Sequence, residues 1–258
     1  QQYLALPWSD DTGSLVVSTE SSDYAMADEW SATCYIGPRG QIMDREEAPD
    51  GSVPFVSLAI DCQGDHFWYI VRRWSRTGHS RLAAFDKVLS NEGLTDWSGL
   101  DAVASKWNIH PQLVMVDSGN GRDAHEVYKQ CAIRGWGTAK GSGQEYFNVK
   151  TKVGDTVRRF YQAPSAIHVP GIQKPTSLVV WSNLSGKDLF YGLRARKVFT
   201  FARDATQDYV EQLNSETRVK DNGKPIWRIR QGVKDNHAFD CELLGMLIAC
   251  RWGIVGRD

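Results

Sequence analysis

The 258 residues, 41% of them hydrophobic, can bury one large core, and no apolar run approaches the roughly 20 residues of a membrane-spanning helix. The five cysteines are odd in number and lack CxxC spacing, which argues against a zinc ribbon or disulfide framework and favours reduced, buried thiols. The formal net charge of −1 hides two unlike halves: residues 1–128 hold 9 Lys and Arg against 19 Asp and Glu, whereas residues 129–258 hold 21 against 12.

This charge asymmetry admits two interpretations. An acidic half facing a basic half fits a site where carboxylates gather metal beside a surface that attracts phosphate. Chance segregation of solvated charges explains it equally well.

Residues 1–52 are rich in turn-forming residues, such as Pro7, the Ser-Asp-Asp-Thr-Gly stretch from Ser9, and Pro49-Asp50-Gly51. They predict a loop-rich arm or linker with one short helix near residues 25–33. The chain starts with Gln1 and not Met, and its start lacks the features of a signal peptide, so we expect a piece processed or excised from something longer.

The hydrophobic pattern sharpens from residue 53 onward, where we place a single domain extending to residue 258. Three strands are predicted first, over residues 55–62, 66–74 and 80–88. A helix over residues 94–107 and a second strongly apolar strand over residues 113–116 follow. The remaining predicted elements are a helix over 122–133, a short strand over 136–140, an irregular basic stretch over 141–175, a strand over 178–181, helices over 186–195 and 206–215, a hairpin over 216–230 and a final helix over 237–252.

Adjacent hairpins followed by parallel strands with crossover helices predict an α/β fold of the RNase H-like kind. In this fold a mixed central sheet has its first three strands antiparallel and is flanked by helices. The hairpin prediction rests on Asp221-Asn222-Gly223-Lys224, a strong signal for a type I′ turn.

Three carboxylates occupy informative places in this order. Asp61 ends the first central strand, Asp117 ends the other strongly apolar strand, and Asp240 lies in the first turn of the last helix. If the two strands are parallel neighbours, the first two acids meet at one sheet edge, and a helix packed there can add the third.

Acids this close repel one another unless a cation neutralises them, and Mg²⁺ and Mn²⁺ prefer such oxygen ligands. Two such ions can activate water and stabilise the leaving oxygen of a phosphodiester. The pattern therefore favours two-metal hydrolysis of DNA with Asp61, Asp117 and Asp240 as catalytic residues and metal ligands. Turn formation and helix capping are the ordinary alternatives for each acid taken singly.

The stretches LAIDCQGDHFWYIVRRW, VMVDSGNGRDAHEVYKQC and KDNHAFDCELLGMLIA resemble the nuclease domain of the large terminase subunits of tailed bacteriophages, most closely the lambda-type branch. The family pattern matches at Asp61-Cys62-Gln63, Asp117-Ser118-Gly119, Val127-Tyr128 with Cys131, Lys140-Gly141, and Asn236-His237 with Asp240-Cys241. The resemblance spans about residues 55–249, and its last motif is the most specific.

The resemblance implies a metal-dependent endonuclease that cuts concatemeric double-stranded viral DNA during packaging in the host cytoplasm. It also implies a portal and a small terminase subunit as partners, and an ATPase domain in the same polypeptide. No GxxxxGK[ST] phosphate loop is present in the sequence, since the stretch at Gly186-Lys187 lacks its first glycine and the Ser or Thr. We therefore expect the nuclease portion alone, with residues 1–52 as the joint to the missing motor.

Several residues around the acids are candidates for supporting roles. Asp235 and His237 flank the third acid and can act as outer-shell metal partners, although capping and packing are the ordinary roles for such residues. Lys140 and Lys187 are candidates for phosphate contacts. Other cations are candidates for a backbone groove with strong salt dependence and little base specificity: Arg158, Arg159, Arg194, Arg196, Lys197, Arg228 and Arg230.

Two other functions remain open on the sequence. One is another RNase H-like nuclease with the same acids, such as a junction resolvase or a transposase core. The other is a module without catalytic activity that grips DNA or docks on the portal.

Overall fold

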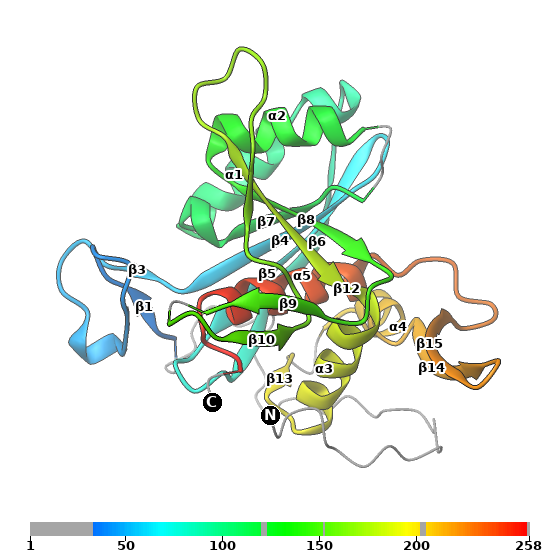
Figure 1. Ribbon diagram of the computed structural model, residues 1–258. Coiled ribbons are helices and arrows are strands. Elements are labelled where there is room, and N and C mark those ends of the chain that lie inside the picture. The colour runs from blue at the N-terminus through cyan, green and yellow to red at the C-terminus, as the bar shows by residue number, and fades with distance from the viewer. Residues whose placement is uncertain (1–32, 120–122, 152, 202–204, 257–258) are drawn as a thin grey trace.

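The computed structural model describes residues 33–119, 123–151, 153–201 and 205–256 (Figure 1). The short helix expected near residues 25–33 lies outside these ranges except for Thr33. No helix within them is long and apolar enough to cross a membrane.

The core of the molecule is one eight-stranded mixed sheet in the order β11-β12-β8-β7-β4-β5-β6-β13. β4, β5 and β6 are antiparallel, whereas β7, β8 and β12 run parallel to β4. Three antiparallel strands followed by parallel crossovers confirm the predicted RNase H-like fold class. The strand bounds are β4 (Val56–Cys62), β5 (His66–Trp74), β6 (Ser80–Leu89), β7 (Val114–Asp117), β8 (Gly137–Ser142), β11 (Ser165–Ile167), β12 (Thr176–Ser182) and β13 (Phe199–Thr200).

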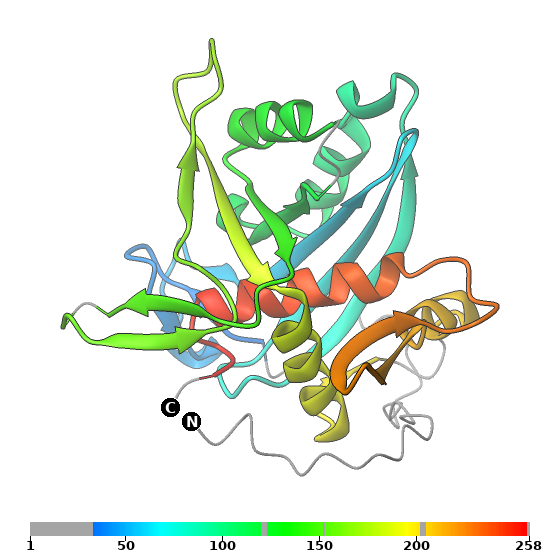
Figure 2. The same cartoon turned by 45° about the vertical axis from the view of Figure 1, so that its right-hand side comes forward.

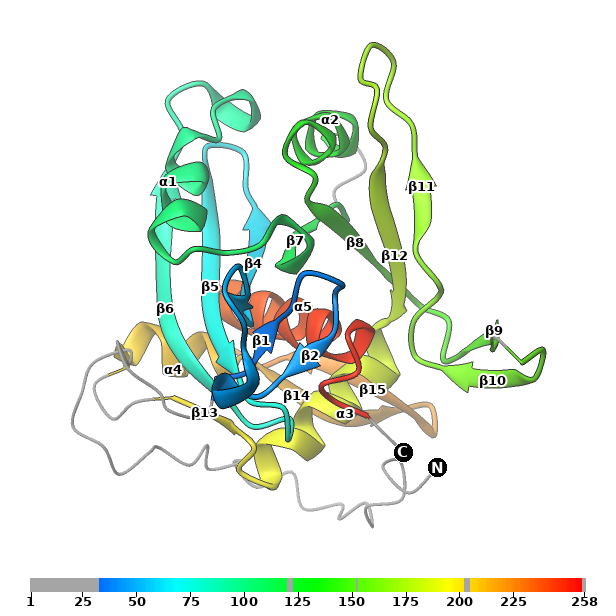
Figure 3. The same cartoon turned by 90° about the vertical axis from the view of Figure 1, so that its left-hand side faces the viewer.

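Helices cover both faces of this sheet, as Figures 1 and 3 show. α1 (Ser98–Lys106) and α2 (Ala124–Arg134) lie on one face. α5 (His237–Arg251) crosses the other face against β4, β5 and β7, with α3 (Asn183–Ala195) and α4 (Gln207–Leu213) beside it. Twelve of its fifteen residues are buried, so α5 is a central core helix.

The sequence explains how these elements begin and end. β4 is buried on both faces, which accounts for its nearly unbroken apolar run. The Ser182 hydroxyl caps α3 by accepting a hydrogen bond from the Ser185 N–H, and Gly135 ends α2 in the left-handed conformation. β14 (Glu216–Asp221) and β15 (Lys224–Ile229) form the expected hairpin, with positive φ angles at both Asn222 and Gly223, as a type I′ turn requires.

The structure differs from the sequence prediction over residues 141–175. This stretch contains the hairpin β9 (Phe147–Lys150) and β10 (Thr156–Arg159) as well as the sheet strand β11. Most residues of these strands are exposed or half-buried, so they carry no alternation of apolar and polar residues by which to recognise them.

Residues 33–54 form a small three-stranded sheet, β1 (Tyr35–Ile36), β2 (Ile42–Met43) and β3 (Val53–Pro54), with a 3₁₀ helix, η3 (Arg45–Glu47), between the last two. Cys34 and Ile36 are buried in the main core. Two further 3₁₀ helices, η4 (Gly93–Thr95) and η5 (Pro111–Leu113), precede α1 and β7.

Candidate active site

Asp61 and Asp117 lie at the same edge of the sheet. β4 and β7 are parallel neighbours in a register that pairs Ile60 with Val116, and each aspartate is the next residue of its strand. Neighbouring strands are separated by about 4.8 Å. The sheet therefore holds the two acids side by side, and Asp61 is only 6% exposed.

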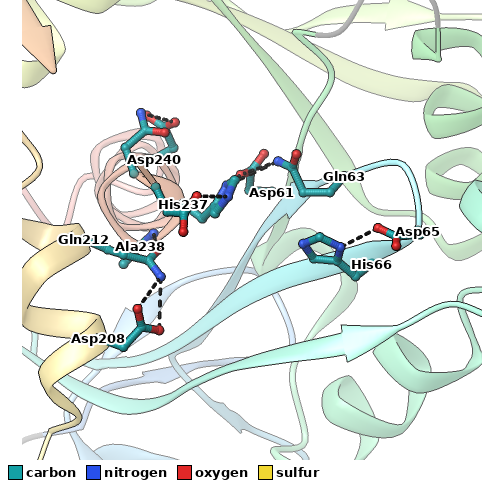
Figure 4. A network of polar contacts seen from close by, with 11 residues as sticks. Asp61, Gln63, Asp65, His66, Asp208, Gln212, His237, Ala238 and Asp240 are labelled. Carbon is teal, nitrogen blue, oxygen red and sulfur yellow. Dashed lines mark hydrogen bonds and ion pairs between the residues drawn. The ribbon is translucent and has the colours of Figure 1, made fainter. Parts of the chain in front are cut away.

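α5 places Asp240 against this edge from the helical face. The start of the helix is fixed because the Ala238 N–H donates to Gln212 Oε1 at 3.0 Å, and the Gln212 amide in turn donates to Asp208 (Figure 4). Asp240 lies in the first turn of α5, one turn after Asn236, whose amide donates to Asp240 Oδ2 at 2.9 Å.

The three acids share one electrostatic field. Burial first, and then the charge of Asp61, raise the pKa of Asp117 to about 6. Burial also raises the pKa of Asp240 to about 8, against the opposing charge of Lys187 and with help from Asp61, Glu216 and Asp117. The charge of Asp61 contributes to the raised pKa of both Asp117 and Asp240, so positive charge is favourable beside these carboxylates.

Asp61 is held by two neighbours (Figure 4). Its Oδ2 lies 2.6 Å from Nδ1 of His237 and accepts a hydrogen bond from the Gln63 amide at 2.9 Å. The His237 ring stacks on Trp68 with centroids 5.5 Å apart. Burial works against a charged ring, yet the hydrogen bond and charge of Asp61 raise the pKa of His237.

A second chain of contacts surrounds Asp240. Glu216, at the start of β14, accepts a hydrogen bond from Asn236 Nδ2 at 3.3 Å and forms an ion pair with Lys187 at 2.6 Å. Glu216 is therefore a further carboxylate beside Asp240, and it is 7% exposed. Lys187 sits among these acids on α3 and its ammonium group is committed to Glu216.

In the described residues, no three His, Cys, Asp or Glu side chains are gathered closely enough to hold one metal ion. Each of the three acids has its own hydrogen-bond partner in this structure. Asp61 is bound to His237, Asp240 to Asn236, and Asp117 Oδ1 accepts from the Gly119 N–H at 3.0 Å. The acids are thus brought to one edge, each with its own partner.

The other residues singled out from the sequence fall into separate groups. Asp235 is exposed, with its Oδ1 3.9 Å from Nε2 of His237. Lys140 is exposed on β8, next to Ala139, the register partner of Asp117. Four other cations lie on or beside two hairpins at opposite ends of α5 (Figure 2): Arg158 and Arg159 on β10, and Arg228 on β15 with Arg230 just beyond it. Arg196 and Lys197 directly follow α3 and are exposed.

One cation expected in the phosphate groove belongs to the core. Arg194 is 6% exposed and donates to the Leu213 carbonyl and to Asn214 Oδ1. It ties α3 to the end of α4 and is not available to DNA.

Glu216 and Gln63 contact the candidate acids or their partners, and neither was predicted as a site residue from the sequence. Glu216 begins a strand of an amphipathic hairpin, and its sequence context has no acidic motif. Gln63 directly follows the Asp61-Cys62 pair, so its place in a matched motif was the available signal.

The mixed sheet, with its first three strands antiparallel and its later strands parallel, gives the protein an RNase H-like fold. A family model for the endonuclease domain of the terminase large subunit gpA matches residues 2–256. The chain belongs to this family, which confirms the resemblance to large-terminase nucleases. No curated protein matches the chain.

Among solved structures, the chain is similar to the large terminase nuclease from thermophilic phage G20c, without and with bound magnesium, and to the large terminase from a second thermophilic bacteriophage. The G20c nuclease is 12% identical over 73% of this chain and 79% of that chain, with a TM-score of 0.41. Its magnesium-bound form is 13% identical over 74% of this chain and 81% of that chain, with a TM-score of 0.41. The large terminase of the second phage is 12% identical over 85% of this chain and 45% of that chain, with a TM-score of 0.43. Likeness at this level transfers no residue roles to this chain.

Proposed function

We propose that this domain is a divalent-metal-dependent endonuclease that cleaves concatemeric double-stranded DNA during viral genome packaging in the host cytoplasm. The observation that carries the proposal is the single electrostatic field of Asp61, Asp117 and Asp240. These three carboxylates come from β4, β7 and α5, and two of them have raised pKa values of about 6 and about 8.

The donor set suits Mg²⁺ or Mn²⁺. All three candidate ligands offer carboxylate oxygens, which both ions prefer, and the buried negative charge is only partly offset by Lys187. The three side chains are not gathered closely enough among the described residues to hold one ion, so Asp61, Asp117 and Asp240 would hold a pair of ions only after turning from their present hydrogen-bond partners. The bound ions would supply Lewis acidity and an activated water for phosphodiester hydrolysis.

The remaining roles belong to side chains of this chain. His237 orients Asp61 and supplies positive charge beside it while the ring is protonated. Asn236 positions Asp240, and the Glu216–Lys187 pair holds the start of β14 against α3. Such outer partners fix the rotamers of the residues that contact a substrate or ion.

Positive charge from residues at the surface is proposed to hold the DNA backbone. Lys140 lies at the acidic edge, and Arg228 and Arg230 lie on the hairpin at the same end of α5. Contacts of this kind produce strong salt dependence and little sequence preference. An ATPase domain of the same polypeptide, a portal and a small terminase subunit are the proposed partners, and the lambda-type branch stays a prediction.

Cleavage of supercoiled plasmid with Mg²⁺, Mn²⁺ or EDTA tests this function. We expect nicking and linearisation only with metal. Asp117→Asn should lower the rate by more than the roughly 10–100-fold that loss of an outer-shell partner costs. Asp44→Asn, at a half-exposed acid just before η3, is the matched control and should cut at the wild-type rate.

Three results would speak against the proposal. Cleavage that persists in EDTA excludes metal dependence, and DNA binding without cleavage under every metal favours a gripping or docking module. Cleavage confined to four-way junctions favours a resolvase. Thermal unfolding with added Mn²⁺ gives a readout besides activity: the melting temperature should rise for the wild-type chain and stay constant for Asp240→Asn.

A further inference from the structure

A cavity of about 550 Å³ lies at the edge of the sheet opposite the acids. Its wall includes Gly137 and Ser177, at the starts of β8 and β12, whereas the acids lie where the parallel strands end. Arg251 and Trp252, at the end of α5, close another side. Its volume is in the range of small-molecule sites, roughly 300–1,000 Å³.

Three cations line this cavity. Lys150 and Arg159 come from β9 and β10, and Arg251 comes from the last turn of α5. No Asp or Glu is among the lining residues in the described part of the chain. The Arg251 side chain is half-buried, and this burial lowers the pKa of its guanidinium group. Cations gathered on a concave wall without acids select for an anion.

The cavity also offers aromatic surface. Tyr161 and Trp252 line it, and both are half-buried. The Tyr161 hydroxyl donates to the Cys250 carbonyl at 3.2 Å, and the Trp252 ring packs edge-on against Phe55. These contacts fix both rings before any ligand arrives. Rigid aromatic rings beside cations are the features that stack a base and hold its phosphate.

This site is separate from the acidic edge. Arg251 comes eleven positions after Asp240 on α5, which at 1.5 Å per residue is a separation of about 16 Å along the helix axis. Figure 2 shows the β9–β10 hairpin at one end of α5 and the β14–β15 hairpin at the other.

We propose that this cavity binds one nucleotide, with its phosphate held by Lys150, Arg159 and Arg251 and its base against the Tyr161 and Trp252 rings. Two sources could supply this ligand, and both offer a phosphate with an attached base. Its source is either a free nucleotide or the end of a single DNA strand. The inference does not depend on the nuclease assignment.

Calorimetric titration of the full chain in EDTA tests this site without cleavage of DNA. The probes are ATP, dTMP, a 5′-phosphorylated oligo(dT) and inorganic phosphate. We expect the nucleotide probes to bind more tightly than phosphate. Lys150→Glu and Arg159→Glu alter exposed residues, so their folds should be retained, and each should weaken nucleotide binding at least tenfold. Arg228→Glu, an exposed arginine at the other end of α5, is the control and should bind ATP and dTMP as the wild type does.

The outcomes distinguish a free nucleotide from the end of a DNA strand, and the cavity from the site at the three acids. Binding of ATP and dTMP indicates a free nucleotide, whereas binding of the oligonucleotide alone indicates a strand end. Asp117→Ala should abolish cleavage and leave nucleotide binding intact, so failure of one proposal is distinguishable from failure of the other. The proposal is overturned by the absence of nucleotide binding, by affinities that Lys150→Glu and Arg159→Glu leave unchanged, or by phosphate binding as tightly as nucleotide.

Discussion

Asp240 and Asp117 illustrate how burial and like charge act on single residues. An ordinary aspartate is fully ionised at neutral pH, yet the pKa values here are about 8 and about 6. The folded chain therefore binds these protons more tightly than the unfolded chain does. The stabilising effect of the protonated form is complete below 3.8, the pKa of an aspartate in the unfolded chain. It is lost as the pH rises through the pKa of each aspartate in the folded chain.

Metal-free protein should accordingly lose stability between about pH 4 and pH 8. In EDTA, Asp240→Asn should flatten the upper part of this decline, between about pH 6 and pH 8, because the amide carries no charge to bury. Asp117→Asn should make the part below about pH 6 less steep. Thermal unfolding at closely spaced pH values measures both effects. Equal pH dependence in the wild type and both variants would contradict the assignment of buried, mutually repelling carboxylates.

At the scale of residues, the candidate acids could be named wherever a sequence motif carried the signal, and their roles stay a prediction. Asp61, Asp117 and Asp240 were selected because they end apolar strands or begin a helix, and the structure places them at one edge. Glu216 was missed because only tertiary packing brings the start of β14 to Lys187 and Asn236. His237 was named as a possible outer-shell partner, but its contact with Asp61 and the contact of Asn236 with Asp240 depend on side-chain geometry that no spacing rule supplies.

At the scale of elements, one buried ion pair fixes α5 to the sheet. Arg72 on β5 donates from Nε to Glu242 Oε2 at 2.7 Å and from Nη2 to Oε1 at 2.8 Å. Tyr209 of α4 donates to the same Oε1 at 2.6 Å. Arg72 and Glu242 are almost wholly inaccessible to solvent. Because Glu242 is two residues from Asp240, this pair helps to set the position of the third acid.

Glu242→Gln should destabilise the chain by about 3–5 kcal/mol, because it leaves the Arg72 charge buried without a partner. Asp44→Asn removes a half-exposed partner of Arg76 and should cost at most about 1 kcal/mol. Urea unfolding monitored by tryptophan fluorescence compares the two. A similar small loss in both variants would contradict a structural role for the buried pair.

Two helical glycines should respond oppositely to alanine. A Cβ at Gly186 of α3 would lie 2.7 Å from Trp181 Cε3, whereas a Cβ at Gly245 of α5 has no neighbour nearer than Ser57 Oγ at 4.0 Å. We expect Gly186→Ala to destabilise by about 1–3 kcal/mol through overpacking. Gly245→Ala should stabilise by up to about 1 kcal/mol through helix propensity. Urea unfolding of both variants checks the difference in sign, and equal effects would refute it.

Most long elements were predictable because their hydrophobic periods are strong. β4, β7 and α5 deviate from the expected ranges by only one or two residues. The missed elements are short or exposed: β13 has two residues, and the β9–β10 hairpin extends away from the main sheet. The pairing of β13 depends on distant partners, Ser80 and Arg81 of β6, which local sequence cannot indicate.

For the whole molecule, the basic second half of the chain does not form one continuous groove. Arg158 and Arg159 lie on one hairpin and Arg228 on the other, at opposite ends of α5, whereas Arg196 is exposed after α3 and Arg194 is in the core. The positive charge of this half is therefore spread over separate surfaces. One of them lies beside the acids, and another contributes to the cavity.

The reactivity of the cysteine thiols depends on how well the whole fold buries them. All five cysteines are free, and burial raises the pKa of each of four of them: Cys62, Cys131, Cys241 and Cys250, the last to about 12. At pH 8 these thiols should react slowly with a disulfide reagent in the native chain, since the thiolate is the reactive form. All five should react at once in guanidinium chloride. Rapid native reaction of several thiols would show that the core is more open than described.

Because α5 comes late in the chain, its position has a consequence for protein synthesis. A ribosome delivers β4 and β7 long before residues 237–251, and those residues supply both Asp240 and the layer that covers β4, β5 and β7. On the proposed assignment, a nascent copy lacking this last helix has neither a complete set of acids nor a closed core. Cutting activity would thus arise only after translation of the domain is nearly finished, which protects viral DNA from half-made enzyme.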